Sequence, residues 1–138
     1  LNIPQLKDIP KLAGENPELP MVLNHLAKPQ TSEEGYFEPW AELMRPLQRI
    51  PNLDFKISGM LTEAGPNPES ATLRPAVRFM IETFGFDRLM WGSDWPVCLT
   101  AGSYRTNFEV TMGAVGDMTD SQRARLLGAN AKRFYRVA

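Results

Sequence analysis

The stretch LMWGSDWP, residues 89–96, decides the fold class of this chain of 138 residues. Its large apolar residues end abruptly at a glycine, a serine and a carboxylate. A short apolar run of this kind is typical of a buried strand. We therefore interpret Arg88 to Trp91 as a strand whose carboxyl end delivers Asp94 to a defined place.

Two similar apolar runs precede this strand at a regular spacing. They are Pro20–Leu26 and Leu53–Gly59, and we interpret both as strands. Polar residues at the three strand ends stand at positions 25, 58 and 94, so they are 58 − 25 = 33 and 94 − 58 = 36 residues apart. A strand with its crossover helix takes roughly 30 residues or more, so three such units fit the chain in register.

Apolar stripes at helical spacing lie between and after the strands. Their members are Trp40, Leu43, Met44, Leu47 and Ile50, then Leu73, Val77, Met80, Ile81 and Phe84, and last Tyr104, Phe108, Met112 and Val115. Thr119 and Gln122 have the spacing of a capping box, which predicts one more helical region. Strands that alternate with helices predict an α/β fold with a parallel sheet. Because no linker or low-complexity tract interrupts it, residues 1–138 are predicted to form a single domain.

The composition excludes several classes of partner. Fifteen Lys and Arg against sixteen Asp and Glu leave a net charge of −1 with no basic run, so we expect neither nucleic acid nor an anionic membrane as a partner. No apolar segment approaches the ~20 residues of a membrane span, and the first residues do not resemble a signal peptide. The single cysteine, Cys98, favours a reducing compartment, and we predict the cytoplasm.

The carboxyl ends of parallel strands usually build the ligand site of an α/β protein. His25, Ser58 and Asp94 are predicted to meet there. Each also has a structural interpretation: Asp94 as a turn residue, His25 as a hydrogen-bonded core residue, and Ser58 as a partner for the backbone of a turn.

Four motifs in one order resemble the C-terminal half of the amidohydrolase-related family, which includes sugar lactonases and 2-pyrone-4,6-dicarboxylate hydrolase. They are HLAKP (25–29), KISG (56–59), FGFDRLMWGSDWPV (84–97) and LGANAKRFY (127–135). The stretch WGSDWPVCLTAGSY (91–104) resembles in particular the L-fuconolactonase type.

This resemblance implies the (β/α)₈ TIM barrel of the metallo-dependent hydrolase type, with the three strands as its sixth to eighth. A complete barrel takes ~250 residues, so residues 1–138 would be one partial domain, the C-terminal half. The His-x-His pair that the family carries on its first strand is absent, because His25 is the only histidine.

The resemblance also implies roles for individual residues. Asp94 would be the base that takes a proton from attacking water, and His25 would bind or polarise the substrate carbonyl. Trp95, Ser58 and Lys28 are predicted substrate contacts, although each also has a structural interpretation. The enzyme would use either no cofactor or one divalent metal, with zinc expected, and Asp94 and His25 would be ligands if a metal is bound.

The predicted function is a hydrolase of carbohydrate metabolism that opens a small-molecule lactone of a sugar acid. One alternative is a metal-dependent decarboxylase of the same superfamily that acts on aromatic acids. The other is a non-catalytic module that binds partners through an exposed sheet edge. A half barrel has two open strand edges and, we expect, an apolar inner face, so we predict that the chain alone self-associates.

Overall fold

Three parallel strands in the order β1 (Met21–Leu23), β2 (Leu53–Ile57) and β3 (Leu89–Trp91) form the sheet of the computed structural model, which describes residues 3–137. The register pairs Leu23 with Phe55 and Phe55 with Leu89. Strand order therefore follows chain order, as in consecutive βα units. The predicted α/β class with a parallel sheet is confirmed.

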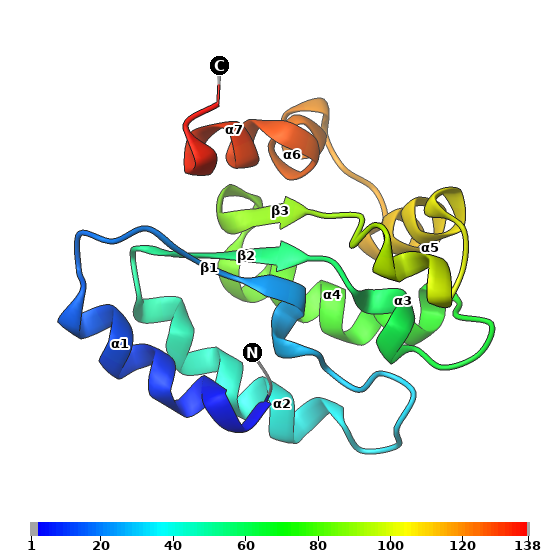
Figure 1. Cartoon of the computed structure of the whole chain (residues 1–138), viewed down its shortest axis with the longest axis horizontal. Helices are drawn as coiled ribbons and strands as arrows, with labels where there is room; N and C mark the ends of the chain where they lie inside the picture. Colours follow the sequence, from blue (N-terminus) through cyan, green and yellow to red (C-terminus); the bar gives the residue numbers. More distant parts are fainter. Residues whose placement is uncertain (1–2, 138) are drawn as a thin grey trace.

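Helices surround this sheet on most sides (Figure 1). The α-helices are α1 (Ile9–Glu15), α2 (Phe37–Met44), α3 (Met60–Glu63), α4 (Ser70–Phe84), α5 (Tyr104–Val115), α6 (Asp120–Ala124) and α7 (Asn130–Tyr135). Short 3₁₀ segments are η1 (Ile3–Asp8), η2 (Asn24–Ala27), η3 (Arg45–Arg49), η4 (Phe86–Arg88) and η5 (Val97–Thr100), and a π-helical turn, η6 (Arg125–Ala129), joins α6 to α7. Within residues 3–137, every helix is too short or too polar to cross a bilayer.

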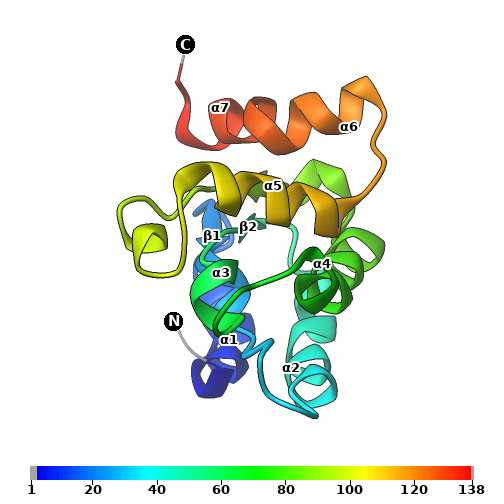
Figure 2. The same ribbon diagram turned by 90° about the vertical axis from the view of Figure 1, so that its right-hand side faces the viewer.

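The helices divide into groups around the strands. In Figure 1, α1 and α2 lie below the sheet, whereas α6 and α7 lie above β3. The view turned by 90° shows α2 and α4 along one side of the strands, with α3 in front of them at the carboxyl end (Figure 2).

Alternating side chains give the sheet two different faces. On β2, Leu53, Phe55 and Ile57 are buried in the core, and the ring of Phe55 lies 4.1 Å from that of Phe84 on α4. Asp54 and Lys56 occupy the opposite face and are only partly buried. The prediction of an apolar inner face is therefore wrong for β2, because two of its residues on that face are charged.

The ends of several predicted elements also differ from the structure. The second strand stops at Ile57 rather than at Gly59, and the third begins at Leu89 rather than at Arg88. The first strand stops at Leu23 rather than at Leu26, because the backbone turns into η2. The helix predicted from Trp40 to Ile50 is α2 followed by the tighter η3. Pro46 near the start of η3 lacks the N–H that would continue the α-helical hydrogen bonds.

The predicted capping box begins α6. The side chain of Thr119 accepts a hydrogen bond from the backbone N–H of Gln122 at 3.3 Å, and the backbone N–H of Thr119 donates to Gln122 Oε1 at 2.9 Å. The reciprocal pair satisfies two backbone donors that the first turn would otherwise leave free. The helix therefore begins where the sequence predicts.

Candidate active site

A left-handed turn directly after β1 presents His25. Four consecutive residues, His25 to Lys28, have positive φ values of 57°, 47°, 58° and 57°. Each such residue costs roughly 1–2 kcal/mol, so the surrounding structure must hold the turn in place. The buried indole of Trp40 donates to the carbonyl of Leu26 at 2.8 Å, and the N–H of Lys28 donates to the carbonyl of His25 at 2.7 Å. The chain thus leaves the strand at once and fixes the position of the imidazole.

The segment after β2 supports the imidazole from one side. Nδ1 of His25 lies 2.9 Å from Oγ of Ser58, whose residue is only 4% exposed. Gly59 follows with φ +63°, and a Cβ at this position would lie 2.8 Å from Nδ1 of His25. Position 59 therefore requires glycine for two reasons, the backbone conformation and the close approach of the ring.

The segment after β3 brings in the carboxylate. A Cβ on Gly92 would lie 3.1 Å from Cβ of Ser58, so the two strand ends approach closely here. Asp94 itself has φ +56°, a conformation that Asp tolerates better than most residues. The buried amide of Asn107 on α5 donates to the carbonyl of Ser93 at 2.6 Å and anchors this segment.

The three residues predicted to meet at the carboxyl edge do lie together. Nε2 of His25 is 3.7 Å from Oδ1 of Asp94, and the two side chains are 30% and 17% exposed. His25 and Asp94 border a pocket of about 230 Å³. Its lining residues are His25, Lys28, Gly59, Thr62, Glu63, Asp94 and Val97. The arrangement places one imidazole and one carboxylate where a small molecule can reach both.

A second charged pair borders the same pocket. Nζ of Lys28 lies 3.3 Å from Oε1 of Glu63, and the Glu63 side chain is 17% exposed. Glu63 is a functional candidate that was not predicted from the sequence; it stands at the end of α3, the short helix that follows β2. Its helix, α3, stands at the carboxyl end of the strands (Figure 2).

Trp95 is the predicted site residue that lies apart from this pocket. It is 65% exposed and is absent from the pocket lining, whereas Val97 borders the pocket. Of the other two predicted substrate contacts, Lys28 lines the pocket, whereas Ser58 is buried and does not. The substrate-contact roles of Trp95, Ser58 and Lys28 stay predictions.

The pair of His25 and Asp94 fits two positions of a zinc site. Two ligands of a tetrahedral zinc ion, each roughly 2.0–2.1 Å from the metal, lie about 3.4 Å apart. The observed 3.7 Å between Nε2 and Oδ1 is close to that separation. Among the described residues, no group of three or more His, Cys, Asp or Glu side chains could enclose a metal ion, so further ligands would have to come from outside them.

Residues 3–137 match the family model described as Amidohydrolase, and the chain belongs to that family. It is 39% identical over 130 residues to an L-fucono-1,5-lactonase of Burkholderia ambifaria, which covers 91% of this chain and 44% of that protein. The chain therefore spans about half the length of the curated relatives it matches.

Solved structures agree with this assignment. An amidohydrolase of Burkholderia multivorans with bound zinc superposes with a TM-score of 0.91 at 29% identity, covering 100% of this chain and 51% of that one. A putative 2-pyrone-4,6-dicarboxylic acid hydrolase of Pseudomonas putida gives 0.73 at 27% identity, covering 95% and 49%. The predicted fold, part of an amidohydrolase (β/α)₈ barrel, is confirmed.

Proposed function

We propose that this chain supplies one part of the active site of an enzyme that hydrolyses a sugar-acid lactone. The observation that carries the proposal is the convergence of His25 and Asp94 on one pocket at the carboxyl end of the sheet. The similarity to a protein named as an L-fucono-1,5-lactonase supports a lactone as the substrate.

The positions of the two side chains define the roles that we assign to them. Asp94 accepts a proton from the water whose oxygen attacks the lactone carbonyl carbon. If the hydroxyl of Ser58 donates to Nδ1 of His25, the ring proton stays on Nε2, which can donate to the carbonyl oxygen as it becomes negative. The tetrahedral intermediate then releases the ring oxygen, which takes the proton from Asp94, and the product is the open hydroxy acid.

We propose zinc as the metal if one is bound, with Asp94 and His25 as the ligands from this chain; Nε2 of His25 would then carry no proton, and Nδ1 would donate to the hydroxyl of Ser58. Such an ion would polarise the carbonyl and acidify water. The zinc present in the B. multivorans structure supports this assignment.

The near-neutral charge supports the absence of nucleic acid or membrane as a partner, and the single buried cysteine, Cys98, supports the predicted cytoplasmic location.

Turnover on two kinds of substrate tests the reaction class. In the complete enzyme that contains this chain, we expect release of acid from a sugar δ-lactone such as L-fucono-1,5-lactone. We expect no release of carbon dioxide from an aromatic acid such as 5-carboxyvanillate, since the solved decarboxylases of this fold resemble the chain less closely. Decarboxylation without lactone hydrolysis would reverse the proposal in favour of the decarboxylase alternative.

The chain by itself is proposed to be inactive and to self-associate. Among the described residues, β1 pairs with one neighbour only and has an open edge that another chain could pair with. The prediction of a second open edge at β3 is wrong, because α6 and α7 lie above this strand and the buried amide of Asn130 donates to the carbonyl of Leu89. Analytical ultracentrifugation of residues 1–138, together with a lactone assay, measures both properties. A monodisperse monomer that turns over the lactone would contradict the proposal.

A further inference from the structure

Besides its reactive pair, the pocket is lined by a second charged pair, formed by Glu63 and Lys28. We propose that the Glu63 carboxylate is the residue that selects a neutral, polyhydroxylated lactone by accepting hydrogen bonds from its hydroxyl groups. The inference rests on the proposed lactone hydrolysis and adds to it the residue that recognises the hydroxyl groups of the substrate.

The backbone holds Glu63 in place independently of its side chain. Its carbonyl accepts a hydrogen bond from the N–H of Ser32 at 3.1 Å and another from the hydroxyl of Thr31 at 3.2 Å. These bonds fasten the loop after β1 to the end of α3. The carboxylate therefore does not have to hold the loop, and the backbone that carries it is in place before any ligand binds.

The carboxylate has acceptor capacity to spare. Lys28 approaches Oε1, and it is the one charged partner that the described residues give to Glu63. An ionised carboxylate offers about four lone-pair sites, so hydroxyl groups of a ligand can occupy those that the lysine leaves. Because the side chain is only 17% exposed, water reaches it poorly, and a ligand that offers donors gains more than it would at an open surface.

The charges around the pocket point to the same class of ligand. Glu63 and Asp94 carry negative charge, Lys28 carries positive charge, and His25 is neutral or singly positive. With a neutral imidazole these side chains sum to −1. A lactone with carboxylate substituents would meet net repulsion from the four side chains together, whereas a neutral polyol would meet both donors and acceptors of hydrogen bonds.

A pair of lactones with the same ring isolates the effect of the hydroxyl groups. L-fucono-1,5-lactone carries hydroxyl groups, and δ-valerolactone has the same six-membered ring without them. In the complete enzyme, Glu63→Gln should lower kcat/KM for the sugar lactone about 10- to 100-fold, mainly through KM. The same variant should change kcat/KM for δ-valerolactone by less than about 3-fold, because that ligand makes no bond to position 63.

Glu38→Gln is the matched control. Glu38 on α2 also forms an ion pair, with Arg45 at 2.8 Å, but it lies outside the pocket lining. This variant removes the same charge from the protein and should leave both lactones unaffected. Thermal unfolding of both variants shows whether the fold is retained.

The outcomes separate the inference from the function on which it rests. If the unaltered enzyme hydrolyses neither lactone, the proposed function is wrong. If it hydrolyses both and Glu63→Gln slows them equally, or slows neither, Glu63 does not recognise hydroxyl groups and the inference is overturned. Should the glutamine variant fold poorly, Lys28→Met provides the second measurement. It leaves the carboxylate in place and should keep the preference for the sugar lactone; loss of that preference would assign the selection to Lys28 instead.

Discussion

The two ends of the sheet are built in opposite ways. At the carboxyl end, His25 and Asp94 lie on backbone with positive φ, and their side chains are partly exposed at a pocket. At the amino end, the guanidinium of Arg88 donates to backbone carbonyls at distances of 2.5–3.5 Å; these belong to Leu47, Gln48, Ile50 and Leu53. The hydrogen bonds at the amino end therefore stabilise the fold. The residues of the site at the carboxyl end lie instead in a backbone conformation of higher free energy.

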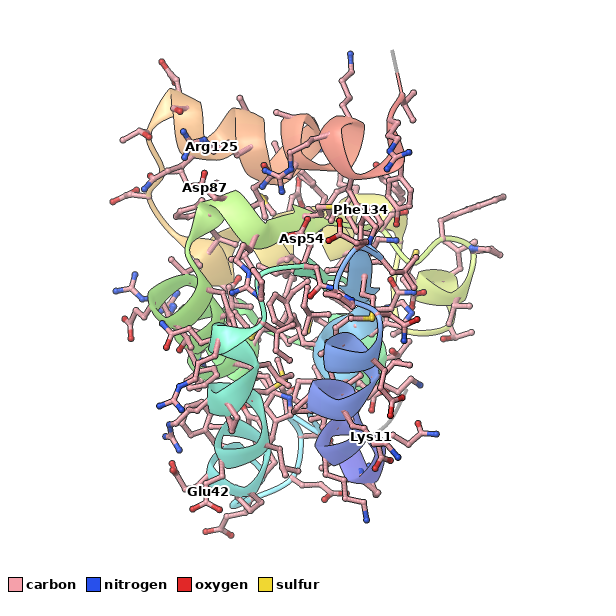
Figure 3. The ribbon with its side chains drawn as sticks, turned by 90° about the vertical axis from the view of Figure 1, so that its left-hand side faces the viewer. Lys11, Glu42, Asp54, Asp87, Arg125 and Phe134 are labelled. Carbon is pink, nitrogen blue, oxygen red and sulfur yellow. The ribbon has the colours of Figure 1, made fainter. Side chains whose placement is uncertain are left out.

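The last helix adds further bonds at the amino end. The buried amide of Asn130 donates to the carbonyls of Phe86 and Leu89 at 2.6 and 2.8 Å. Arg133 donates to Asp54 on β2 at 3.1 Å and to the carbonyl of Asp87 at 2.9 Å. Figure 3 looks onto this end and shows Asp54 beside Phe134, and Asp87 beneath Arg125, with which Asp87 forms an ion pair.

The difference teaches where substitutions should affect stability and where they should affect turnover. Arg88 lies over the rings of Phe55 and Phe84, with its guanidinium carbon 5.2 and 5.4 Å from their centroids. Burial lowers the pKa of the Arg88 guanidinium, and the nearby charge of Asp54 partly opposes this shift. A partly buried arginine that donates to the carbonyls of four residues stabilises the fold, whereas an imidazole and a carboxylate that border a pocket can take part in chemistry.

The largest effect is expected from Asp94→Asn in the complete enzyme. The amide cannot accept the proton of the attacking water, so kcat should fall about 10²–10⁴-fold, roughly 3–5 kcal/mol in the barrier. Asp87→Asn, at the opposite end of β3, is the control and should keep kcat within about 2-fold. A folded Asp94→Asn enzyme with near-normal kcat would refute the assignment of the base.

The next effect is expected from Arg88→Met at the amino end. The apolar side chain preserves much of the volume but leaves the carbonyls around it without their donor. The free energy of unfolding should fall by about 3 kcal/mol, as chemical denaturation can measure, while kcat of the folded fraction stays unchanged. Arg125→Met removes only an exposed ion pair and should cost less than about 1 kcal/mol. Equal losses of unfolding free energy in the two variants would show that the hydrogen bonds of Arg88 do not stabilise the amino end of the sheet.

Gly59→Ala should affect both properties. Alanine at φ +63° costs roughly 1 kcal/mol, and its Cβ would also press on Nδ1 of His25, so we expect a total loss of about 2 kcal/mol. Gly35→Ala is matched to it, because Gly35 also has positive φ, +76°, but open space around the new Cβ. Only the change at position 59 should lower kcat, since it displaces the imidazole. Parallel unfolding and turnover measurements of the two variants decide this.

The smallest effect is expected from Ser58→Ala. Without the hydroxyl, Nδ1 of His25 loses the partner that orients the ring, and kcat should fall about 10-fold, or ~1.4 kcal/mol. Ser58→Thr retains the hydroxyl and should restore most of the activity, provided that the extra methyl group fits beside Gly92. If the alanine variant lost stability without any change in kcat, Ser58 would be a packing residue only.

Much of the fold could be predicted from short apolar runs and from apolar stripes of period 3.6 in the sequence. The stripe from Tyr104 to Val115 predicts α5 with the bounds that the structure has, and Thr119 with Gln122 predicts the start of α6. The end of the first strand could not be predicted in this way. Among residues His25 to Lys28, only His25 is of a type that is enriched at positive φ, and none is a glycine or asparagine, so the sequence does not signal four left-handed residues in a row.

The sequence by itself determined the order of the βα units, the family, and the meeting of His25, Ser58 and Asp94 at one edge. It could do so because the carboxyl ends of parallel strands always share an edge, whatever the length of chain between them. Only the tertiary structure decided which nitrogen of His25 faces Ser58 and which faces Asp94. It also decided that Glu63 borders the same pocket as His25, and that Arg88 donates to carbonyls at the opposite end of the sheet. These contacts depend on side-chain directions and on distances of a few ångströms, which the packing of helices against the sheet sets and which no spacing along the chain encodes.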